Sequence, residues 1–378
     1  MILFVQPHFT YPGGGGKVVL EIGERLAQMG LEVGVLALSA DRDVIAPYPR
    51  IEFLIMPAPL PGKISHWLSF PALMRNMEKM LAEIKIDVLF PHVFPANYWG
   101  FLYKRRHREI PCLWFCHEPS AFVHNLNIIR GLAGPIKYAA LLANPFLQIA
   151  DRKLAGYADR ILVNSRYTAK QVERIYGQPA TVVYPGVATG EFRPSGQKKD
   201  YIFTIGRLTR FKRIDLIFRA LALLKGDGKE VKLVIGGDGE DKQRLIQTAG
   251  IMGLENQVSF TGRIADERVR ELLAGARAVI FPTTNEPFGI VPLEAMACGT
   301  PVIVSNSGGP METVIDGQTG LLFHPDDAAD LARKIDIMVG EREKASEMAA
   351  AARQHVSDNF SWEQAAEQTY GIIKDLTG

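Results

Sequence analysis

Cysteine is scarce in this chain of 378 residues, and Cys112, Cys116 and Cys298 do not have the spacing of a zinc knuckle or a redox pair. Few, scattered and odd in number, they are typical of a reducing compartment. No apolar run approaches the ~18 residues of a membrane span. No basic leader precedes the first apolar residues, so we expect no signal peptide and a cytoplasmic protein.

A strong charge of either sign is also absent. Lys plus Arg number 43 against 41 acidic residues, for a net charge of +2. Because nucleic-acid-binding domains usually have a large basic excess, we expect no nucleic-acid partner. With 47% hydrophobic and 22% charged residues, the composition is that of a globular protein, and the length favours two domains over one.

Short runs of strand-forming residues alternate with longer helical patterns. In the first half we predict strands at 2–5, 32–38, 51–56, 87–90, 112–116 and 160–163, with helices at 18–29 and 71–84. In the second half the predicted strands are 201–205, 232–235, 257–260, 278–281 and 301–304, and the helices are 214–224, 241–249, 266–274, 290–297, 328–338 and 341–354. This alternation is typical of doubly wound parallel sheets.

The predicted fold class is therefore α/β, with two Rossmann-like domains. Residues 184–200 are rich in Pro, Gly and polar residues, as interdomain linkers often are. We predict an N-terminal domain over 1–190, a C-terminal domain over 191–357 and a last helix over 358–378. Because doubly wound sheets bind ligands beyond the carboxyl ends of their strands, we expect a site in a crevice between the two.

The segment richest in chemical signals is 283–299, Thr-Thr-Asn-Glu-Pro-Phe-Gly-Ile-Val-Pro-Leu-Glu-Ala-Met-Ala-Cys-Gly. A Pro/Gly turn follows a predicted strand, and a helix begins near Ile290. The backbone amides of Phe288, Gly289 and Ile290 would then point out of a helix N-terminus. Such a terminus suits a phosphate group.

Two glutamates accompany this turn. Glu286 precedes it, and Glu294 lies about one helical turn beyond its end. A carboxylate beside a phosphate site is electrostatically unfavourable unless it accepts hydrogen bonds from hydroxyl groups, which a sugar nucleotide would supply. The alternative is that both glutamates are solvated residues at the helix end; the turn and the paired spacing together favour a ligand.

A second cluster, Gly206-Arg207-Leu208-Thr209-Arg210-Phe211-Lys212-Arg213, directly follows the predicted strand at 201–205. Basic residues in loops are usually solvated. At a strand end, however, Arg207 and Lys212 could clamp a diphosphate and stabilise its charge as it leaves. Fixed cations there could also take the place of a metal ion.

Two glycine-rich turns follow strands. The first includes Gly14, Gly15 and Gly16, where glycine would permit positive φ and close approach to a ligand. It is not GxGxxG, and no acidic residue ends the next strand, which argues against a nicotinamide-dependent oxidoreductase. The second turn, Gly237-Asp238-Gly239, repeats the strand–glycine–helix arrangement, and a nucleotide could lie there.

His117 ends an apolar run at the same expected edge of the first sheet. It could bond a donor hydroxyl or the reacting sugar, although a lone histidine is often structural. The triplet Asp41-Arg42-Asp43 imitates a metal-binding carboxylate pair, but nothing else in the sequence supports a metal site there.

Taken together, these residues resemble glycosyltransferase family four. The family's paired-glutamate signature is matched by Glu286 and Glu294, eight positions apart. The further matches are Gly206-Arg207 with Lys212, Gly237-Asp238-Gly239, Ser307-Gly308-Gly309-Pro310-Met311-Glu312, the first glycine turn and His117. The likeness runs from the first strand to about Gly320 and is strongest in the second half.

The resemblance implies the GT-B fold, in which two Rossmann-like domains face a central cleft and the last helix returns to the N-terminal domain. It implies transfer with retention of anomeric configuration, with neither metal nor other cofactor. His117 would lie near the anomeric carbon. The implied mechanism is a front-side displacement in which the leaving phosphate takes the acceptor's proton.

The resemblance also assigns the donor site. Arg207 and Lys212 would hold the diphosphate. Glu286 and the amides that follow it would hold the transferred sugar, and Glu294 would hold the ribose. Arg263-Ile264 would lie near the base. The first glycine turn would face the acceptor and the sugar-phosphate end of the donor.

The donor itself is predicted less directly. Residues 285–296 and 306–310 look like mannosyltransferases that use GDP-mannose to extend dolichol-linked oligosaccharides. However, four glycines and Lys17 replace the common Gly-Gly-Ala-Glu-Arg opening. A UDP-sugar, either UDP-glucose or a UDP-N-acetylhexosamine, is therefore the alternative donor, and a hydrolase or epimerase of nucleotide sugars is a further one. A binding protein without catalysis is not favoured, because the motif residues are intact.

Residues 58–150 are the least family-like part of the chain. We expect them to determine the specificity for the acceptor, which we predict to be a glycan or a lipid-linked molecule. Residues 60–80 include Trp67 and Phe70, and 104–108 form the basic run Lys-Arg-Arg-His-Arg. Aromatic and basic surface of this kind could make peripheral contact with the inner face of an anionic membrane. The alternative is a set of core-packing helices and a solvated charged loop.

Overall fold

The structure, a computed structural model, describes residues 1–10, 13–56, 69–126, 129 and 134–378. The chain divides into two compact units. Unit 1 comprises Met1–Tyr184 and Trp362–Gly378, and unit 2 comprises Pro185–Ser361. The predicted boundaries after residues 190 and 357 lie close to these limits in sequence. Among the described helices, none has both the length and the hydropathy needed to cross a bilayer.

Unit 1 is built on parallel strands. One sheet has the order β5 (Glu52–Ile55), β3 (Val33–Ala37), β1 (Ile2–Val5), β6 (Val88–Pro91), and a second has the order β7 (Leu113–Cys116), β8 (Arg160–Val163), β9 (Thr181–Val182). A parallel bridge between Leu89 and Cys112 joins β6 to β7. The chain order reverses at β1, which lies between β3 and β6. Ligands of doubly wound sheets bind at such a switch point.

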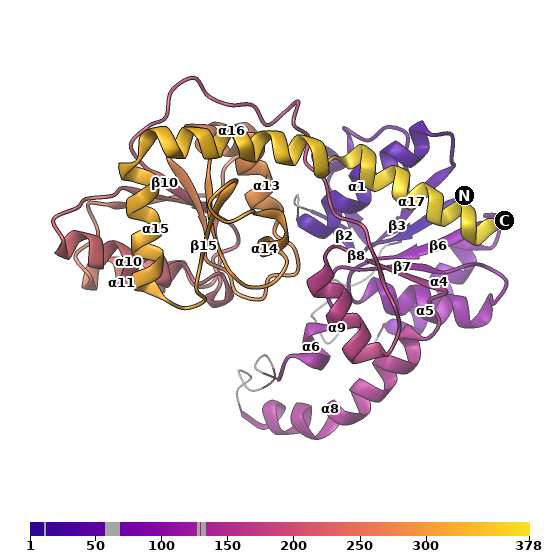
Figure 1. Ribbon diagram of the computed structural model, residues 1–378. Helices are drawn as coiled ribbons and strands as arrows, with labels where there is room; N and C mark the ends of the chain where they lie inside the picture. The colour runs from indigo at the N-terminus through magenta and orange to yellow at the C-terminus, as the bar shows by residue number, and fades with distance from the viewer. Residues whose placement is uncertain (11–12, 57–68, 127–128, 130–133) are drawn as a thin grey trace. The chain divides into compact units, whose positions relative to one another are not determined.

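Helices cover both faces of this sheet. Figure 1 shows α1 (Gly14–Gln28) and α17 (Trp362–Thr377) on one side of the strands, and α4 (Phe70–Leu81) and α5 (Ala96–Arg106) on the other. The other helices of unit 1 among the described residues are α2 (Arg42–Ile45), α6 (Ala121–His124), α8 (Gly134–Ala155) and α9 (Arg166–Tyr176). The last helix completes the unit: α17 packs along α1, where Arg25 pairs with Glu363 at 2.8 Å.

Alternation along the strands explains the core of unit 1. Leu3 and Val5, two positions apart on β1, point to one side and join a cluster with Met77 of α4 and Trp99 of α5, all of them nearly or completely buried. A strand covered on both faces must be apolar at every position, and β1, Ile-Leu-Phe-Val, is. This continuous burial fixes the carboxyl edge of β1 and β6 in place.

Unit 2 holds a single parallel sheet. Its order is β12 (Val258–Gly262), β11 (Leu233–Gly236), β10 (Ile202–Ile205), β13 (Ala278–Phe281), β14 (Val302–Ser305), β15 (Gly320–Phe323). One apolar cluster joins the strands to α10 (Ile214–Gly226), α11 (Lys242–Ile251) and α15 (Ala328–Gly340). The other helices are α12 (Asp266–Gly275), α13 (Ile290–Ala297), α14 (Pro310–Thr313) and α16 (Arg342–Asn359). The switch point lies between β10 and β13.

The predicted α/β class with two parallel-sheet units is confirmed. The strands at 160–163 and 278–281 and the helix at 290–297 have the predicted bounds. The first helix begins earlier than predicted: α1 starts at Gly14, because the Lys17 amide already donates to the Gly13 carbonyl at 2.9 Å. Gly14, Gly15 and Gly16 therefore form the first turn of a helix and not a loop with positive φ.

Candidate active site

An ion pair lies at the switch point of unit 2. Lys212 ends η1 (Arg210–Lys212), a short 3₁₀ turn after β10, and Glu286 follows β13. The Lys212 Nζ atom donates to Glu286 Oε2 at 2.8 Å, and both side chains are about one quarter exposed. Lys212 Nζ also lies 5.3 Å from the centre of the Phe281 ring. The two predicted residues of opposite charge are thus held together and remain accessible to a ligand.

Close backbone packing holds Glu286 in place. The Gly309 amide donates to the Glu286 carbonyl at 2.8 Å, and the Asn285 amide donates to Ser307 Oγ at 3.0 Å. A Cβ atom on Gly308 would lie 2.4 Å from the Glu286 carbonyl oxygen, so only glycine fits there. The loops after β13 and β14 therefore form one rigid support for the carboxylate.

Backbone strain is concentrated beside the same pair. Among the residues that the structure describes, the non-glycine positions with positive φ are Arg213 at 51°, Asn285 at 56° and Asp326 at 63°. Arg213 immediately follows Lys212, and Asn285 immediately precedes Glu286. Arg213 also pairs with Asp326, which ties the two strained positions together. Strained backbone often accompanies functional sites, because the surrounding structure must hold it. Sequence reasoning assigned no role to Arg213 or Asp326.

The helix predicted to bind phosphate has the expected form. Gly289, with φ of 86°, caps α13, and no side chain bonds the cap. The helix begins at Ile290, as predicted. The Phe288 side chain is buried, so its backbone is the part that could contact a ligand. Glu294 lies inside α13 and is partly buried.

The loops after β10 and β11 interlock through glycine. A Cβ atom on Gly237 would lie 2.0 Å from the Gly206 carbonyl oxygen, and one on Gly239 would lie 2.3 Å from that of Leu208. The Leu208 amide donates to the Asp238 carbonyl at 2.9 Å. The structure thus brings the predicted glycines Gly206, Gly237 and Gly239 together at one strand edge.

The Asp238 carboxylate is occupied locally. It accepts from the Gly239 amide at 2.8 Å and from Lys242 Nζ at 3.3 Å. The hydrogen bond from the Gly239 amide is the largest cause that lowers the pKa of Asp238, and the hydrogen bond from Lys242 is the next. The charge of Arg263 makes a smaller contribution. Arg263 and Ile264 follow β12 directly, at the carboxyl edge of this sheet.

Arg207 does not join the central pair. Its side chain is 72% exposed and its Nη2 atom lies 3.4 Å from Glu240 Oε2. The structure therefore separates the two predicted diphosphate ligands: Lys212 is held against Glu286, whereas Arg207 lies at the surface with a different acidic partner.

A pair of histidines lies beside the switch point of unit 1, at the carboxyl edge of its sheet. His117 follows β7 and His92 follows β6; His92 Nδ1 and His117 Nε2 are 3.0 Å apart. The His92 ring stacks on the rings of Phe4 and Phe115, with centroids 5.3 Å away in each case. Burial lowers the pKa of His117 to about 3. Burial, and then the charge of His117, bring the pKa of His92 well below its usual range, so both rings are neutral at pH 7.

The position of the protons follows from the surroundings of His92. Its Nε2 atom is buried and has no hydrogen-bond partner among the described residues. An unpaired buried N–H group is rarer in proteins than an unpaired acceptor. We therefore assign the proton to His92 Nδ1, which donates to His117 Nε2, and leave His117 with its own proton on Nδ1. His92 was not predicted from the sequence.

The first glycine turn lies against the same histidine. A Cβ atom on Gly15 would lie 2.9 Å from Val93 Cγ1 and 3.8 Å from His117 Nε2. The glycine is thus explained by close packing and not by positive φ. The structure brings Gly15 and His117 together at the carboxyl edge of unit 1.

Across the part of the chain that the structure describes, no three His, Cys, Asp or Glu side chains are grouped so as to hold an ion. The Asp41-Arg42-Asp43 triplet has a structural explanation, because Asp41 caps α2 by accepting from the Asp43 amide at 3.1 Å.

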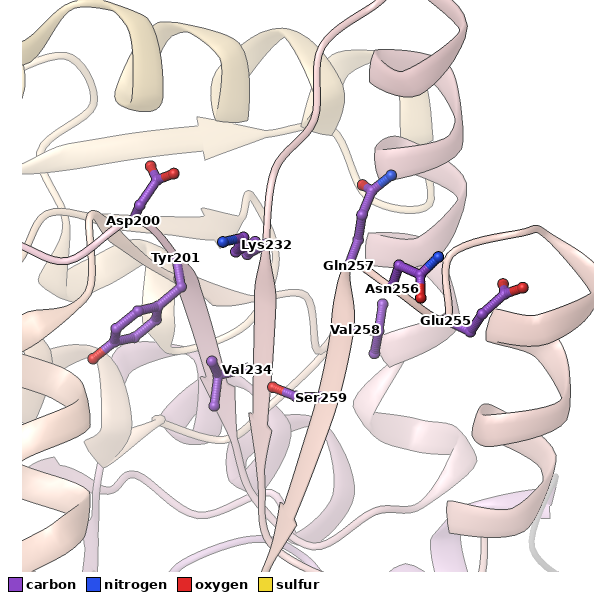
Figure 2. A pocket seen from close by; sticks show the side chains of 9 residues that line it. All are labelled: Asp200, Tyr201, Lys232, Val234, Glu255, Asn256, Gln257, Val258 and Ser259. Carbon is purple, nitrogen blue, oxygen red and sulfur yellow. The ribbon is translucent and has the colours of Figure 1, made fainter.

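Two surface hollows lie in unit 2. The hollow in Figure 2 lies where β10, β11 and β12 begin, and its lining includes Asp200, Lys232 and Gln257. Ligands of such sheets bind at the carboxyl ends of the strands, so this hollow is at the wrong edge. The other hollow adjoins η1 and is lined by Arg210, Arg213, Asp215 and Arg244.

The two edges can do complementary chemistry. The edge of unit 2 offers a cation, a carboxylate and a helix N-terminus, which suit a ligand with both phosphates and hydroxyls. The edge of unit 1 offers a neutral imidazole N–H, which suits a hydroxyl oxygen.

Comparison with known proteins gives a family. Residues 191–355 match the family described as "Glycosyl transferases group 1", and residues 12–191 match "Glycosyltransferase Family 4". A D-inositol 3-phosphate glycosyltransferase of Rhodococcus erythropolis is 29% identical over 96% of this chain and 86% of its own. The alpha-1,3/1,6-mannosyltransferase ALG2 of Dictyostelium discoideum is 32% identical over 70% of each chain.

A solved structure shows the same fold. Anabaena Alr3699/HepE, crystallised in complex with UDP and glucose, superposes with a TM-score of 0.81 over 99% of both chains at 21% identity. At that identity the likeness shows the fold alone. With the matches to both halves and the similarity to the Dictyostelium protein, it confirms the resemblance found in the motifs: the chain belongs to glycosyltransferase family four and has the family's GT-B fold.

Proposed function

We propose that this glycosyltransferase is a retaining, metal-independent mannosyltransferase that uses GDP-mannose. The observation that supports the proposal best is the Lys212–Glu286 pair, 2.8 Å apart at the switch point between β10 and β13. A nucleotide sugar brings phosphate oxygens and sugar hydroxyls to one place. A fixed ammonium and a fixed carboxylate would bind these two kinds of group separately.

Donor binding would exchange the partners of this pair. Lys212 would turn from the carboxylate to the diphosphate, with Arg207 joining it from the surface. Glu286 would then accept hydrogen bonds from the sugar hydroxyls. The N-terminus of α13 adds partial positive charge. These groups would stabilise the negative charge of the departing diphosphate, so that no metal ion is required.

In the proposed reaction the acceptor oxygen attacks the anomeric carbon on the face from which the diphosphate leaves. The bond from the anomeric carbon to the phosphate oxygen breaks as the new glycosidic bond forms. The acceptor's proton passes to the departing phosphate oxygen, and the configuration is retained. His117, neutral and with a proton on Nδ1, would donate to an oxygen of the sugar and hold its orientation.

Mannose is supported by residues 285–296 and by the Dictyostelium relative, whose printed activity is mannosyl transfer. A second candidate donor is a UDP-sugar, either UDP-glucose or a UDP-N-acetylhexosamine. Two observations favour it: Lys17 departs from the usual glycine opening, and the structural neighbour was crystallised with UDP and glucose. For the acceptor we propose a glycan or lipid-linked glycan bound by unit 1.

The test is calorimetric titration with GDP, UDP, ADP, GDP-mannose and UDP-glucose, each with and without EDTA. We expect selective binding of GDP and GDP-mannose that EDTA does not change. Lys212→Met should weaken GDP binding at least about tenfold, by loss of a charge-assisted contact. Lys229→Met is the matched control, since Lys229 forms a comparable 2.6 Å ion pair with Asp336 away from the site.

Each outcome has a distinct meaning. Preference for uridine nucleotides would replace mannose by the second candidate and keep the site. Binding that EDTA abolishes would overturn the metal-independent mechanism. Equal affinities for Lys212→Met and Lys229→Met would remove Lys212 from the diphosphate site.

A further inference from the structure

Helix α8 has its polar side turned inward. Asn144 and Asp151 are buried and Gln148 is partly buried, all on the side that contacts the rest of unit 1. Asn144 Nδ2 donates to the Val123 carbonyl at 2.7 Å, and Gln148 Nε2 donates to Asn144 Oδ1 at 2.8 Å. This arrangement is the reverse of an ordinary surface helix, whose apolar side faces the core.

Asp151 fixes the helix in this orientation. Its carboxylate accepts from Tyr98 Oη at 2.5 Å and from Ser120 Oγ at 3.2 Å, and it contacts His124 Nε2 at 2.6 Å. Satisfied polar networks of this kind specify a single packing, because the buried groups would lose their partners in any other. The orientation of α8 is therefore determined by its polar residues.

The outward side of α8 is apolar. Tyr138, Leu142, Phe146 and Ile149 are 67%, 77%, 74% and 62% exposed. Their spacing of three and four residues places them along one side of the helix. Phe122 of α6, a helix that packs against α8, is also 62% exposed. Figure 1 shows α8 as a long helix at the margin of unit 1. Contiguous exposed apolar surface of this kind marks an interaction site.

The exposed charges at the ends of this apolar side are positive. The charged residues of 134–155 are Lys137, Asp151, Arg152 and Lys153. Asp151 is buried, whereas Arg152 and Lys153 are exposed and Lys137 is partly exposed. The sequence has no Asp or Glu anywhere in 119–150. An apolar side bounded by cations is typical of helices that lie in the surface of an anionic membrane.

From this arrangement we infer that α8 lies in the surface of an anionic lipid bilayer. The apolar side chains enter the boundary between headgroups and acyl chains, and the flanking cations contact lipid phosphates. A second copy of the chain is a poorer occupant: two α8 helices in antiparallel contact would bring Lys137 near Arg152 and Lys153, and the only acid of α8, Asp151, is buried. The inference does not depend on the donor or the reaction.

The surface expected from the sequence is a weaker candidate. Lys104 is largely buried and donates to the carbonyls of Arg108 and Ile110, while Arg106 and His107 both contact Glu78. Lys104, Arg106 and His107 of the 104–108 run are therefore already engaged by partners within the protein. Trp67 lies outside the described residues. The exposed apolar residues of α8 were not identified from the sequence.

The test is flotation of the whole protein with unilamellar vesicles, either of phosphatidylcholine alone or with about one third phosphatidylglycerol. We expect binding to the anionic vesicles, lost at high salt. The double variant Leu142→Ser/Phe146→Ser should lower the partition constant at least about tenfold. Arg152→Gln/Lys153→Gln should lower it severalfold and reduce its salt dependence. Ile251→Ser is the matched control, because Ile251 is 87% exposed on α11 of unit 2.

Insertion can be observed directly. The three native cysteines are buried, so a cysteine introduced on α8 can be labelled selectively with a polarity-sensitive fluorophore. Ala143→Cys, on the exposed side of α8, should report a blue shift with anionic vesicles, and Ala350→Cys on α16 should not. Unchanged flotation of the Leu142/Phe146 variant would overturn the inference. So would a dimer, seen by sedimentation velocity, that this variant dissociates while vesicles bind neither form.

Discussion

The two units share an architecture but differ at the carboxyl edges of their sheets. In unit 2 the carboxyl ends of β10 and β13 hold an ion pair, Lys212 and Glu286, partly open to solvent. In unit 1 the ends of β6 and β7 hold two uncharged histidines stacked among aromatic rings. Sheets of the same kind thus have different electrostatics at their carboxyl edges, because the residues after the strands, and not the strands themselves, determine the site.

This difference suits the two edges to different roles in glycosyl transfer. A charged edge can bind phosphates and stabilise a leaving group, and it tolerates solvent because its charges are paired. A neutral imidazole in an apolar surround can orient a sugar without attracting a second anion. The structure explains each choice by its surroundings: strained loops support the ion pair, and aromatic stacking keeps the histidines neutral.

Removing the charge of Glu286 from the charged edge should have the largest effect on the rate of transfer. Glu286→Gln keeps the shape of the side chain but removes its charge and one acceptor. We expect transfer to fall by about 10²–10³-fold, since a preorganised polar group at the reacting sugar is lost. The free energy of unfolding should change by less than about 1 kcal/mol, because the pair is partly exposed.

Initial rates with a transferable donor, and urea unfolding, measure the two quantities. Asp336→Asn is the control for loss of an exposed carboxylate from an ion pair in the same unit. Wild-type rates in Glu286→Gln would show that the charged edge is not the site of the chemistry.

The rigid support of that edge can be tested through glycine. Gly237 has φ of 105°, and a Cβ atom there would lie 2.0 Å from the Gly206 carbonyl oxygen. Gly237→Ala should therefore destabilise unit 2 by about 2–4 kcal/mol, through both backbone strain and a clash with backbone. Nucleotide binding should weaken in parallel.

Gly228→Ala separates the two causes. Gly228 has φ of 75° but nothing lies within 4 Å of a Cβ atom there, so the expected loss is about 1 kcal/mol from strain alone. Equal losses in the two alanine variants, measured by urea unfolding, would mean that the Gly206–Gly237 contact adds nothing.

The sequence predicted the charged edge better than the neutral one, for a physical reason. Glu286, Lys212 and the glycines follow strands in an order that parallel-sheet topology converts into proximity. His92 gave no such signal by itself. The clue was the repetition of an apolar strand followed by histidine, in 88–92 and again in 113–117: neighbouring parallel strands place equivalent positions side by side.

Helix α8 illustrates a different limit. Its periodicity indicates a helix, but the usual rule assigns apolar positions to the core and polar ones to solvent. The rule fails here because Asp151 finds three partners, from α5, α6 and the residue before α6, that are distant in sequence. Such a network is visible only after folding, and so is the apolar surface that it turns outward.

The role of His92 at the neutral edge can be tested with His92→Phe. This variant preserves the ring stack but removes the hydrogen bond to His117. We expect kcat to fall about tenfold with little change in the KM for the donor, because one positioning hydrogen bond is lost. Phe4→Leu, which weakens the same stack without touching that bond, is the control. Similar kcat values for both variants would assign His92 a purely structural role.

The smallest expected effect is the pH dependence of the free energy of unfolding. The folded pKa of His117 is about 3, below the value of ~6.5 expected in the unfolded chain. The folded state therefore binds fewer protons, so stability from this group is fully present above pH ~6.5 and is lost as pH falls toward 3. Since His117 is partly exposed, we expect a loss of about 1 kcal/mol between pH 7 and pH 5.

Urea unfolding at the two pH values measures this loss, and His92→Phe/His117→Phe should reduce it. The charged edge provides the contrast: Lys212→Met/Glu286→Gln should leave the difference between pH 7 and pH 5 as in the wild type, since this variant retains both histidines. If instead the histidine variant keeps the full pH dependence, folding does not lower the pKa values of the two rings. Burial would then not keep the imidazoles neutral as the pH falls, and the proposed contact of a neutral His117 with the sugar would lose its support.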